Sequence, residues 1–284
     1  SRHASSMNAS ALIYTCALGD FADIDLEQYE IVAVTGNSLG WYLALAAAGA
    51  LSPKAAITLI DTMGQLMEDH GVGGQIVYPT VDTEWRHNEE RAAYVTEAMA
   101  NARSTKGAEV YHSIHLGGME VLAGNEKGLG TLEEALPQAD ERFPFRLARH
   151  AAFHTPLLNH VSQMAQDLLP PSLFQRSQLP MIDGRGKVWR PYDNLTDLWE
   201  YTLGEQIIDT YDFSTAVEVA MKEFAPDRLI VLGPGSSLGP PIAQTLIRHD
   251  WRGIDSKSRF ISSQSSDPFV LAMGIEEQRR RVTR

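Results

Sequence analysis

The sequence predicts an α/β protein in which a large domain is interrupted by a smaller one. Strand-like and helix-like patterns alternate along most of the chain, which favours a sheet with parallel strands. Between residues 73 and 149 the order of the patterns becomes β-α-β-β-α-β, the order of the ferredoxin-like motif. We therefore expect a large α/β domain with a parallel-sheet core, formed by residues 1–72 and 150–284, and a small ferredoxin-like domain at 73–149.

The first part of the large domain is expected to hold a helix, a strand and two more helices. The β-branched run at 31–35 predicts a buried strand, and the Ala- and Leu-rich stretch at 41–49 predicts a helix directly after a turn. The last of these helices is expected over about 52–69, because Ser52-Pro53 is a typical start signal for a helix.

The small domain and the remainder of the chain show the same kinds of pattern. In the small domain we expect strands at 75–78, 109–115, 119–123 and 143–148, with helices at 87–102 and 125–136. In the remainder we expect helices at 157–168, 192–203 and 214–224 and after Pro240-Pro241, with strands at 179–182 and 228–232.

The turn Gly36-x-Ser38-x-Gly40 is the strongest chemical signal of the chain. A serine between two glycines, after a strand and before a helix, is typical of the nucleophile elbow of α/β-hydrolase-like domains. We expect a side chain at either glycine to collide with the approaching strand and helix. The Ser38 hydroxyl would then be exposed at the helix N-terminus, where the backbone N–H of Leu39 favours a developing oxyanion. The alternative is an ordinary glycine-rich turn.

A serine hydroxyl is a weak nucleophile, so Ser38 needs a base within hydrogen-bond reach. His154 is the best candidate, because it interrupts a predominantly apolar stretch at 151–158. The alternative is a histidine that packs in the core. His112, His115 and His249 are weaker candidates.

Three segments resemble a known family. Gly36-Asn-Ser-Leu-Gly-Trp-Tyr-Leu-Ala-Leu-Ala-Ala-Ala-Gly49 resembles the G-H-S-L-G-E-Y segment of the malonyl-CoA:acyl carrier protein transacylases and the acyltransferase domains of polyketide synthases. Ala151-Ala-Phe-His154 resembles their A-F-H segment, and Leu232-Gly-Pro-Gly-Ser-Ser-Leu238 resembles their late G-P-G turn. The order of the three segments is also that of the family.

The resemblance implies an acyltransferase that moves a malonyl or related group from CoA to the phosphopantetheine thiol of an acyl carrier protein. It implies that Ser38 is the nucleophile and His154 the base, and that the backbone carbonyl of Gln206 orients the imidazole; otherwise Gln206 is a solvated helix residue. Acyl-CoA and the carrier protein would be its partners, with no cofactor and no metal.

The chain departs from the family pattern around the expected substrate pocket. Asn37 replaces a histidine, Trp41 a glutamate, and Met63 the arginine that pairs with the malonyl carboxylate in malonyl-specific members. Phe153 keeps the malonyl-type signature before the histidine. The N-terminal strand and glutamine loop of the family, which supply an oxyanion N–H, are expected to be absent. We therefore expect a divergent member whose acyl preference has moved toward uncharged or longer chains.

The composition agrees with a cytoplasmic enzyme. The formal net charge of −12 argues against nucleic acid as a partner. The lone Cys16 excludes an internal disulfide, and no apolar run reaches the about 18 residues of a membrane span. An acidic carrier protein would need a basic patch, for which the candidates are Arg142, Arg146 and Arg149 or the arginines at 279–284; a solvated helix end is the alternative for the latter.

Two other functions fit the same residues. A hydrolase would release the acyl group from Ser38 to water, and Asp227 with His249 could complete its catalytic triad. A non-catalytic subunit could bind an acyl carrier partner without transferring the group.

Overall fold

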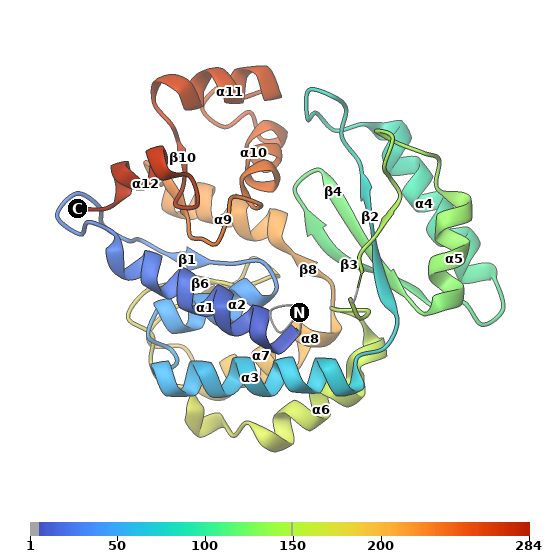
Figure 1. Ribbon diagram of the computed structural model, residues 1–284, viewed down its shortest axis with the longest axis horizontal. Coiled ribbons are helices and arrows are strands. Elements are labelled where there is room, and N and C mark those ends of the chain that lie inside the picture. Colours follow the sequence, from blue (N-terminus) through green and yellow to red (C-terminus); the bar gives the residue numbers. More distant parts are fainter. Residues whose placement is uncertain (1–5, 149) are drawn as a thin grey trace.

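The computed structural model describes residues 6–148 and 150–284 and shows a large and a small lobe side by side (Figure 1). The large lobe begins with α1 (Ser6–Asp23), β1 (Val34–Thr35), α2 (Leu39–Ala47) and α3 (Pro53–His70). The Ser52 hydroxyl caps α3 by accepting a hydrogen bond from the backbone N–H of Ala55 at 3.2 Å. This start is the one predicted.

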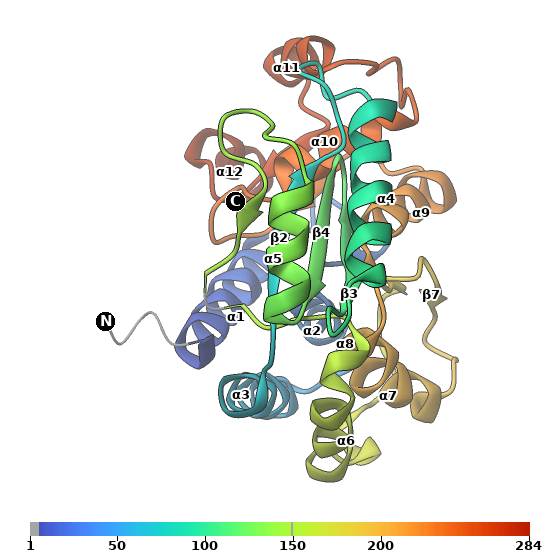
Figure 2. The ribbon, with the colours of Figure 1, turned by 90° about the vertical axis from the view of Figure 1, so that its right-hand side faces the viewer.

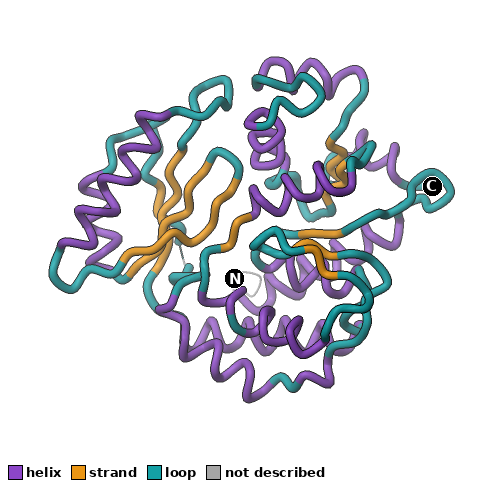
Figure 3. Tube along the Cα trace, turned by 180° about the vertical axis from the view of Figure 1, so that it is seen from behind, coloured by secondary structure: helices purple, strands orange, loops and turns teal. Residues whose placement is uncertain are grey.

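The strands of the large lobe are short and form two separate sheets. β1 pairs in parallel with β6 (Met181–Ile182), which pairs antiparallel with β7 (Val188–Trp189). β9 (Leu229–Val231) pairs in parallel with β10 (Val270–Ala272). The parallel pairing is confirmed, but in the described residues it is divided between two sheets, and the predicted strand 31–35 pairs only at its last two residues. Figure 3 shows these strands surrounded by helices.

The small lobe has the predicted ferredoxin-like order. It consists of β2 (Gly74–Pro79), α4 (Glu89–Ser104), β3 (Val110–Leu116), β4 (Met119–Gly124), α5 (Glu126–Ala135) and β5 (Phe145–Arg146). Its strands lie in the order β5-β2-β4-β3 and neighbours are antiparallel. Both helices cover the same face of the sheet (Figure 2).

The sheet of the small lobe continues into the large one. β8 (Tyr211–Asp212) comes after the small lobe in sequence, yet it pairs in parallel with β3 as a fifth strand. The expected domain limits at 72/73 and 149/150 stay a prediction. β8 lies beyond the second limit in the sequence, yet it pairs with a strand of the small lobe.

Helices make up most of the remaining chain. They are η2 (Pro156–Leu158), α6 (Asn159–Leu168), η3 (Pro171–Leu173), α7 (Leu195–Leu203), α8 (Glu205–Ile208), α9 (Phe213–Phe224), α10 (Gly239–Arg248), α11 (Lys257–Ser266) and α12 (Glu276–Val282). The sequence patterns did not indicate β7, β8, β10, α8, η3 and α11. In the described part of the chain, no helix is both long and apolar enough to cross a bilayer.

Each lobe has its own hydrophobic core. The larger core packs α2 and α3 against α6, α7 and α9 and includes the fully buried Trp41 and Leu45. The smaller core lies between the small sheet and its two helices and includes Ile76, Leu122 and Leu132.

Candidate active site

Ser38 lies in a strained turn directly before α2. Its backbone has φ 55° and ψ −110°, a conformation that L-residues rarely adopt. A Cβ on Gly36 would lie 2.2 Å from the carbonyl oxygen of Gly40, so only glycine fits there. A Cβ on Gly40 would meet nothing within 4 Å. The expected collision is therefore correct for Gly36 and wrong for Gly40, because the side-chain direction at Gly40 points into open space.

The structure brings Ser38 and His154 into contact, although they are 116 residues apart in the sequence. The Ser38 Oγ lies 2.8 Å from the Nε2 of His154, and the His154 Nδ1 lies 2.6 Å from the backbone carbonyl oxygen of Gln206. A carbonyl oxygen only accepts hydrogen bonds, so Nδ1 carries the proton. The lone pair of Nε2 then faces the Ser38 hydroxyl, as a general base requires.

Burial keeps this imidazole neutral. His154 is 4% exposed, and desolvation lowers its pKa from 6.5 to about 4, although the hydrogen bond to Gln206 acts in the opposite direction. At neutral pH the ring is therefore able to accept the hydroxyl proton.

Gln206 contacts the site with its side chain as well as its carbonyl. Its Nε2 donates to the carbonyl oxygen of Ser38 at 3.3 Å, and its Oε1 accepts from the hydroxyl of Tyr42 at 3.1 Å. The residue lies on the four-residue helix α8 and is buried. The alternative of a solvated helix residue is therefore wrong, because both ends of its amide are bound inside the protein.

The loop that carries His154 is held by the small lobe. His154 has φ 57°, so its backbone is strained as well. The preceding carbonyl, that of Phe153, accepts a hydrogen bond from the buried Ser113 hydroxyl at 2.7 Å. Ser113 in turn accepts from the Nε2 of Gln75 at 2.7 Å, and the Oε1 of Gln75 lies 2.6 Å from the Nδ1 of His150. No periodic pattern or motif in the sequence indicates this chain of contacts.

Leu39 is the first residue of α2, where a backbone N–H has no partner within the helix. The turn places this N–H directly after Ser38, at the positive end of the helix dipole. It remains the predicted oxyanion donor.

The four predicted pocket residues lie in different surroundings. Asn37 and Phe153 are half-buried next to Ser38 and His154, and the Oδ1 of Asn37 is buried without a hydrogen-bond partner. Trp41 is fully buried, with its Nε1 donating to the Thr202 hydroxyl at 3.0 Å, and Met63 is 3% exposed in the same core. In this structure Trp41 and Met63 therefore pack in the core instead of lining an open pocket, and their effect on the substrate stays a prediction.

The hydrolase-type triad does not form. His249 lies 3.3 Å from Glu218, and the side chain of Asp227 is 99% exposed. Because neither residue contacts Ser38 or His154, the assignment of these two residues to a triad is wrong.

The arginines near the C-terminus are paired with acidic groups. Arg279 pairs with Asp20 and Asp23, while Arg280, Arg281 and Arg284 pair with glutamates and aspartates nearby. In the other proposed basic patch, Arg146 pairs with Glu126, Arg142 packs on the Phe143 ring, and Arg149 lies outside the described residues. These ion pairs weaken both basic patches as docking sites for an acidic partner.

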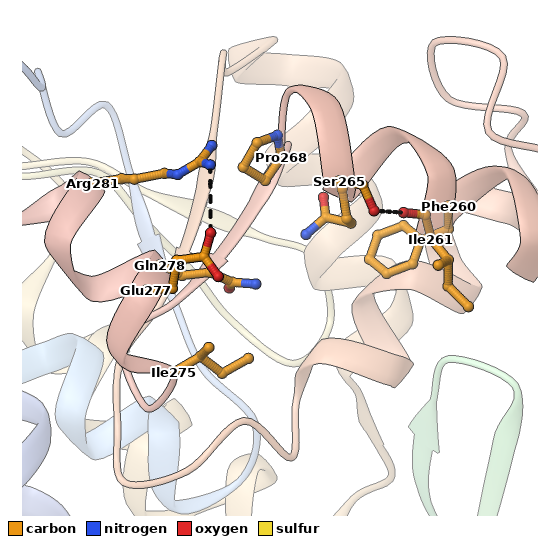
Figure 4. A pocket seen from close by; sticks show the side chains of 9 residues that line it. Phe260, Ile261, Ser265, Pro268, Ile275, Glu277, Gln278 and Arg281 are labelled. Atoms are coloured by element: carbon orange, nitrogen blue, oxygen red, sulfur yellow. Dashed lines mark hydrogen bonds and ion pairs between the residues drawn. The ribbon is translucent and has the colours of Figure 1, made fainter.

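A separate pocket of about 490 Å³ lies between α11 and α12 (Figure 4). Its walls include Phe260, Ile261, Gln264, Pro268, Ile275 and Arg281. The Arg281 guanidinium points to Glu277, one turn earlier on α12. None of the candidate catalytic residues lines this pocket, so it is distinct from the site of Ser38.

Comparison with known proteins supports the resemblance found in the sequence. No family model matches the chain. The chain is 27% identical over 238 residues to a non-reducing polyketide synthase of Aspergillus fumigatus, a match that covers 82% of the chain and 12% of the synthase. The chain thus spans a small part of the length of this curated relative.

Solved structures of transacylases share the fold. The malonyl-CoA:acyl carrier protein transacylase of Xanthomonas oryzae superimposes with a TM-score of 0.75 at 17% identity, covering 100% of this chain and 82% of that one. A malonyl-transacylase in complex with a type II polyketide synthase carrier protein gives 0.72 at 18% identity, covering 98% and 81%. The chain therefore has the fold of the malonyl-CoA:acyl carrier protein transacylases, which confirms the resemblance seen in its sequence.

Proposed function

We propose that this chain is an acyltransferase that moves an acyl group from CoA to the phosphopantetheine thiol of an acyl carrier protein through an acyl-Ser38 intermediate. The observation that carries the proposal is the relay from the Ser38 hydroxyl through His154 to the Gln206 carbonyl, with distances of 2.8 and 2.6 Å. A nucleophile, a base and an orienting group are then in contact, as acyl transfer requires.

In the first half-reaction, His154 accepts the Ser38 proton on Nε2 while Oγ attacks the carbonyl carbon of the thioester. The oxyanion that forms is stabilised by the Leu39 N–H and the dipole of α2. When the C–S bond breaks, CoA leaves as its thiol with the proton from His154. In the second half-reaction the pantetheine thiol gives its proton to His154 and attacks the ester carbonyl, and Ser38 recovers its hydroxyl.

The relatives support this reaction class. Two of them are named a malonyl-CoA:acyl carrier protein transacylase and a malonyl-transacylase in complex with its acyl carrier protein. CoA and pantetheine serve as substrates in this scheme, so it needs no metal and no further cofactor. A cytoplasmic location is part of the proposal, because CoA thioesters and carrier proteins would have to reach the site.

Intact-mass spectrometry after incubation with an acyl-CoA tests the proposal. We expect an adduct of one acyl group on the wild type and none on Ser38→Ala, and we expect the adduct to disappear when a carrier protein with its phosphopantetheine arm is added. Turnover to free acid without a carrier would indicate a hydrolase. A lack of adduct with every acyl-CoA would indicate a non-catalytic subunit.

We further expect malonyl-CoA to be a poorer substrate than acetyl-CoA or hexanoyl-CoA. A carboxylate that leaves water without a cationic partner loses several kcal/mol of solvation. Met63 cannot replace the arginine of malonyl-specific members, and the candidate substitutes are elsewhere: Arg86 donates to the carbonyl of Asp255, and Arg103 lies in the last turn of α4. The measurement is kcat/KM for the three thioesters. A wild type that prefers malonyl-CoA would contradict this.

A further inference from the structure

A β-bulge in the small lobe changes which side chains share a face of the sheet. Residues three apart in a regular strand point to opposite faces. In β3 the register shifts between His112 and Ile114, so that His112 pairs with Leu122, Ile114 with Val121 and His115 with Glu120. Leu122 packs in the core of the small lobe, whereas Ile114 and Val121 pack in the large core. The bulge thus places His112 and His115 on one face of the sheet together with Glu120.

The three side chains converge on that face. The Nδ1 of His115 lies 2.9 Å from both carboxylate oxygens of Glu120, and the Nδ1 of His112 lies 3.2 Å from one of them. All three potential ligand atoms lie within 4.8 Å of one another. In the described residues, this is the one group of three histidine, cysteine or acidic side chains with such spacing.

We propose that His112, His115 and Glu120 form a binding site for a divalent transition metal ion of the zinc class. Two imidazoles and one carboxylate are a donor set that Zn²⁺ binds in proteins. Ligands that each lie about 2.1 Å from such an ion are about 3 to 3.5 Å apart at coordination angles near 90 to 110°. The two separations from the Glu120 carboxylate, 2.9 and 3.2 Å, are close to this range, and the two imidazole ligand atoms lie within 4.8 Å of each other, so side-chain rotation has to bring the three ligands around the ion.

The site is rigid on one side and open on the other. Its ligands lie on paired strands, and β3 is also fixed by β8, which pairs with it at Ile114 and His115. The side chains of His112 and His115 are 36% and 35% exposed, and that of Glu120 is 20% exposed. An ion can therefore enter from solvent, and water can fill its remaining coordination positions.

This site is separate from the proposed acyl transfer. Ser113, the extra residue of the bulge, is fully buried and binds the carbonyl of Phe153, whereas the two histidines are partly exposed to solvent. Zn²⁺ binding can be measured in protein that has no acyl-CoA bound. A lack of Zn²⁺ binding would therefore leave the proposed acyl transfer untouched.

The test is calorimetric titration of Zn²⁺ into the whole chain, after removal of any affinity tag and treatment with a chelator. We expect one ion per chain for the wild type and at least tenfold weaker binding for His115→Ala and for Glu120→Gln. Zn²⁺ should also raise the melting temperature of the wild type and not that of the double variant His112→Ala/His115→Ala, because a ligand stabilises only the state that binds it. Visible absorption of bound Co²⁺ gives a spectroscopic check of nitrogen and oxygen coordination.

His249→Ala is the matched control. This histidine is also partly buried and also contacts a glutamate, Glu218 at 3.3 Å, but only one imidazole is present in that pair. We expect its Zn²⁺ binding to equal that of the wild type. The proposal is overturned if the wild type binds no stoichiometric Zn²⁺, in which case the cluster is only a hydrogen-bonded one. It is also overturned if the double variant, still folded by circular dichroism, binds as tightly as the wild type.

Discussion

The turn of Ser38 and the loop of His154 have similar backbone strain but are stabilised in different ways. Both residues have positive φ, 55° for Ser38 and 57° for His154. The serine turn is built from residues close in sequence: Gly36 allows Gly40 to approach, and the N–H groups of Gly40 and Trp41 bond to the carbonyls of Asn37 and Ser38 at 2.8 and 2.9 Å.

The histidine loop depends on distant parts of the chain. Its contacts come from Ser113 in the small lobe, from Gln206 on α8, and from the Val72 carbonyl, which accepts from the N–H of Ala152 at 2.7 Å. The nucleophile turn is thus held mainly by local bonds, with added hydrogen bonds from Gln206 to the Ser38 carbonyl and from Tyr211 to the Gly36 carbonyl, whereas the base is positioned by both lobes. Changes in the small lobe should therefore affect the base and leave the nucleophile turn intact.

The largest effect on this comparison is expected from His154→Ala. Loss of a general base lowers a rate by about 10² to 10⁴, while the turn of Ser38 keeps its local bonds. The measurement is the rate of acyl-Ser38 formation by rapid quench, with the melting temperature of the same preparation. A variant with unchanged activity per folded molecule would show that His154 only packs in the core.

Gly36→Ala should disrupt the serine turn itself. The new Cβ would lie 2.2 Å from the Gly40 carbonyl oxygen, and such overpacking costs about 1 to 3 kcal/mol or more. Gly40→Ala is the matched control, since its Cβ would meet nothing within 4 Å. Denaturant unfolding of both variants measures the difference. Equal free energies of unfolding would mean that close packing at Gly36 is not what fixes the turn.

Ser113→Ala should affect the base without changing the nucleophile turn. It removes the hydroxyl that binds the Phe153 carbonyl, and we expect acylation to fall by about tenfold, since an unpaired buried polar group costs about 1 to 3 kcal/mol. Thr80→Val is a suitable control, because it removes another buried small-lobe hydroxyl, one that donates to the Gly118 carbonyl at 3.2 Å. If both variants lose the same activity at equal stability, the Phe153 contact has no special role.

The smallest expected effect is the dependence of acylation on pH. Because burial lowers the pKa of His154 to about 4, the ring stays neutral and active as pH falls from 7 to 5. Protonation then fills the Nε2 lone pair, and the rate should fall to half near pH 4. The midpoint is measured from kcat/KM of acyl-enzyme formation between about pH 3.5 and about pH 8. This range includes both the lowered pKa of about 4 and the ordinary histidine pKa of about 6.5. A midpoint near 6.5 would mean that the base is exposed to solvent when it reacts.

The sequence predicted the candidate catalytic residues more completely than the residues that hold them in place. Ser38 and His154 were identified because short motifs surround them, and Gln206 because a local match to the family reached it. Tyr42, Gln75 and Ser113 were missed, since their hydrogen bonds join residues from 38 to 164 positions apart, for which one sequence has no periodic signal. The same holds for β8, whose two residues pair with β3 across the lobes.

The sequence by itself determined the elements with strong local signals: the capped helix α3, the β-α-β-β-α-β order of the small lobe and the glycine turn of Ser38. These depend on periodicity, capping and backbone freedom, which act over a few residues. Only the tertiary structure decided that Trp41 and Met63 pack in the core, that the C-terminal arginines are paired, and that a bulge brings His112 and His115 to Glu120. The burial of a side chain and its pairing with another depend on which distant segments come into contact, and long-range packing determines those contacts.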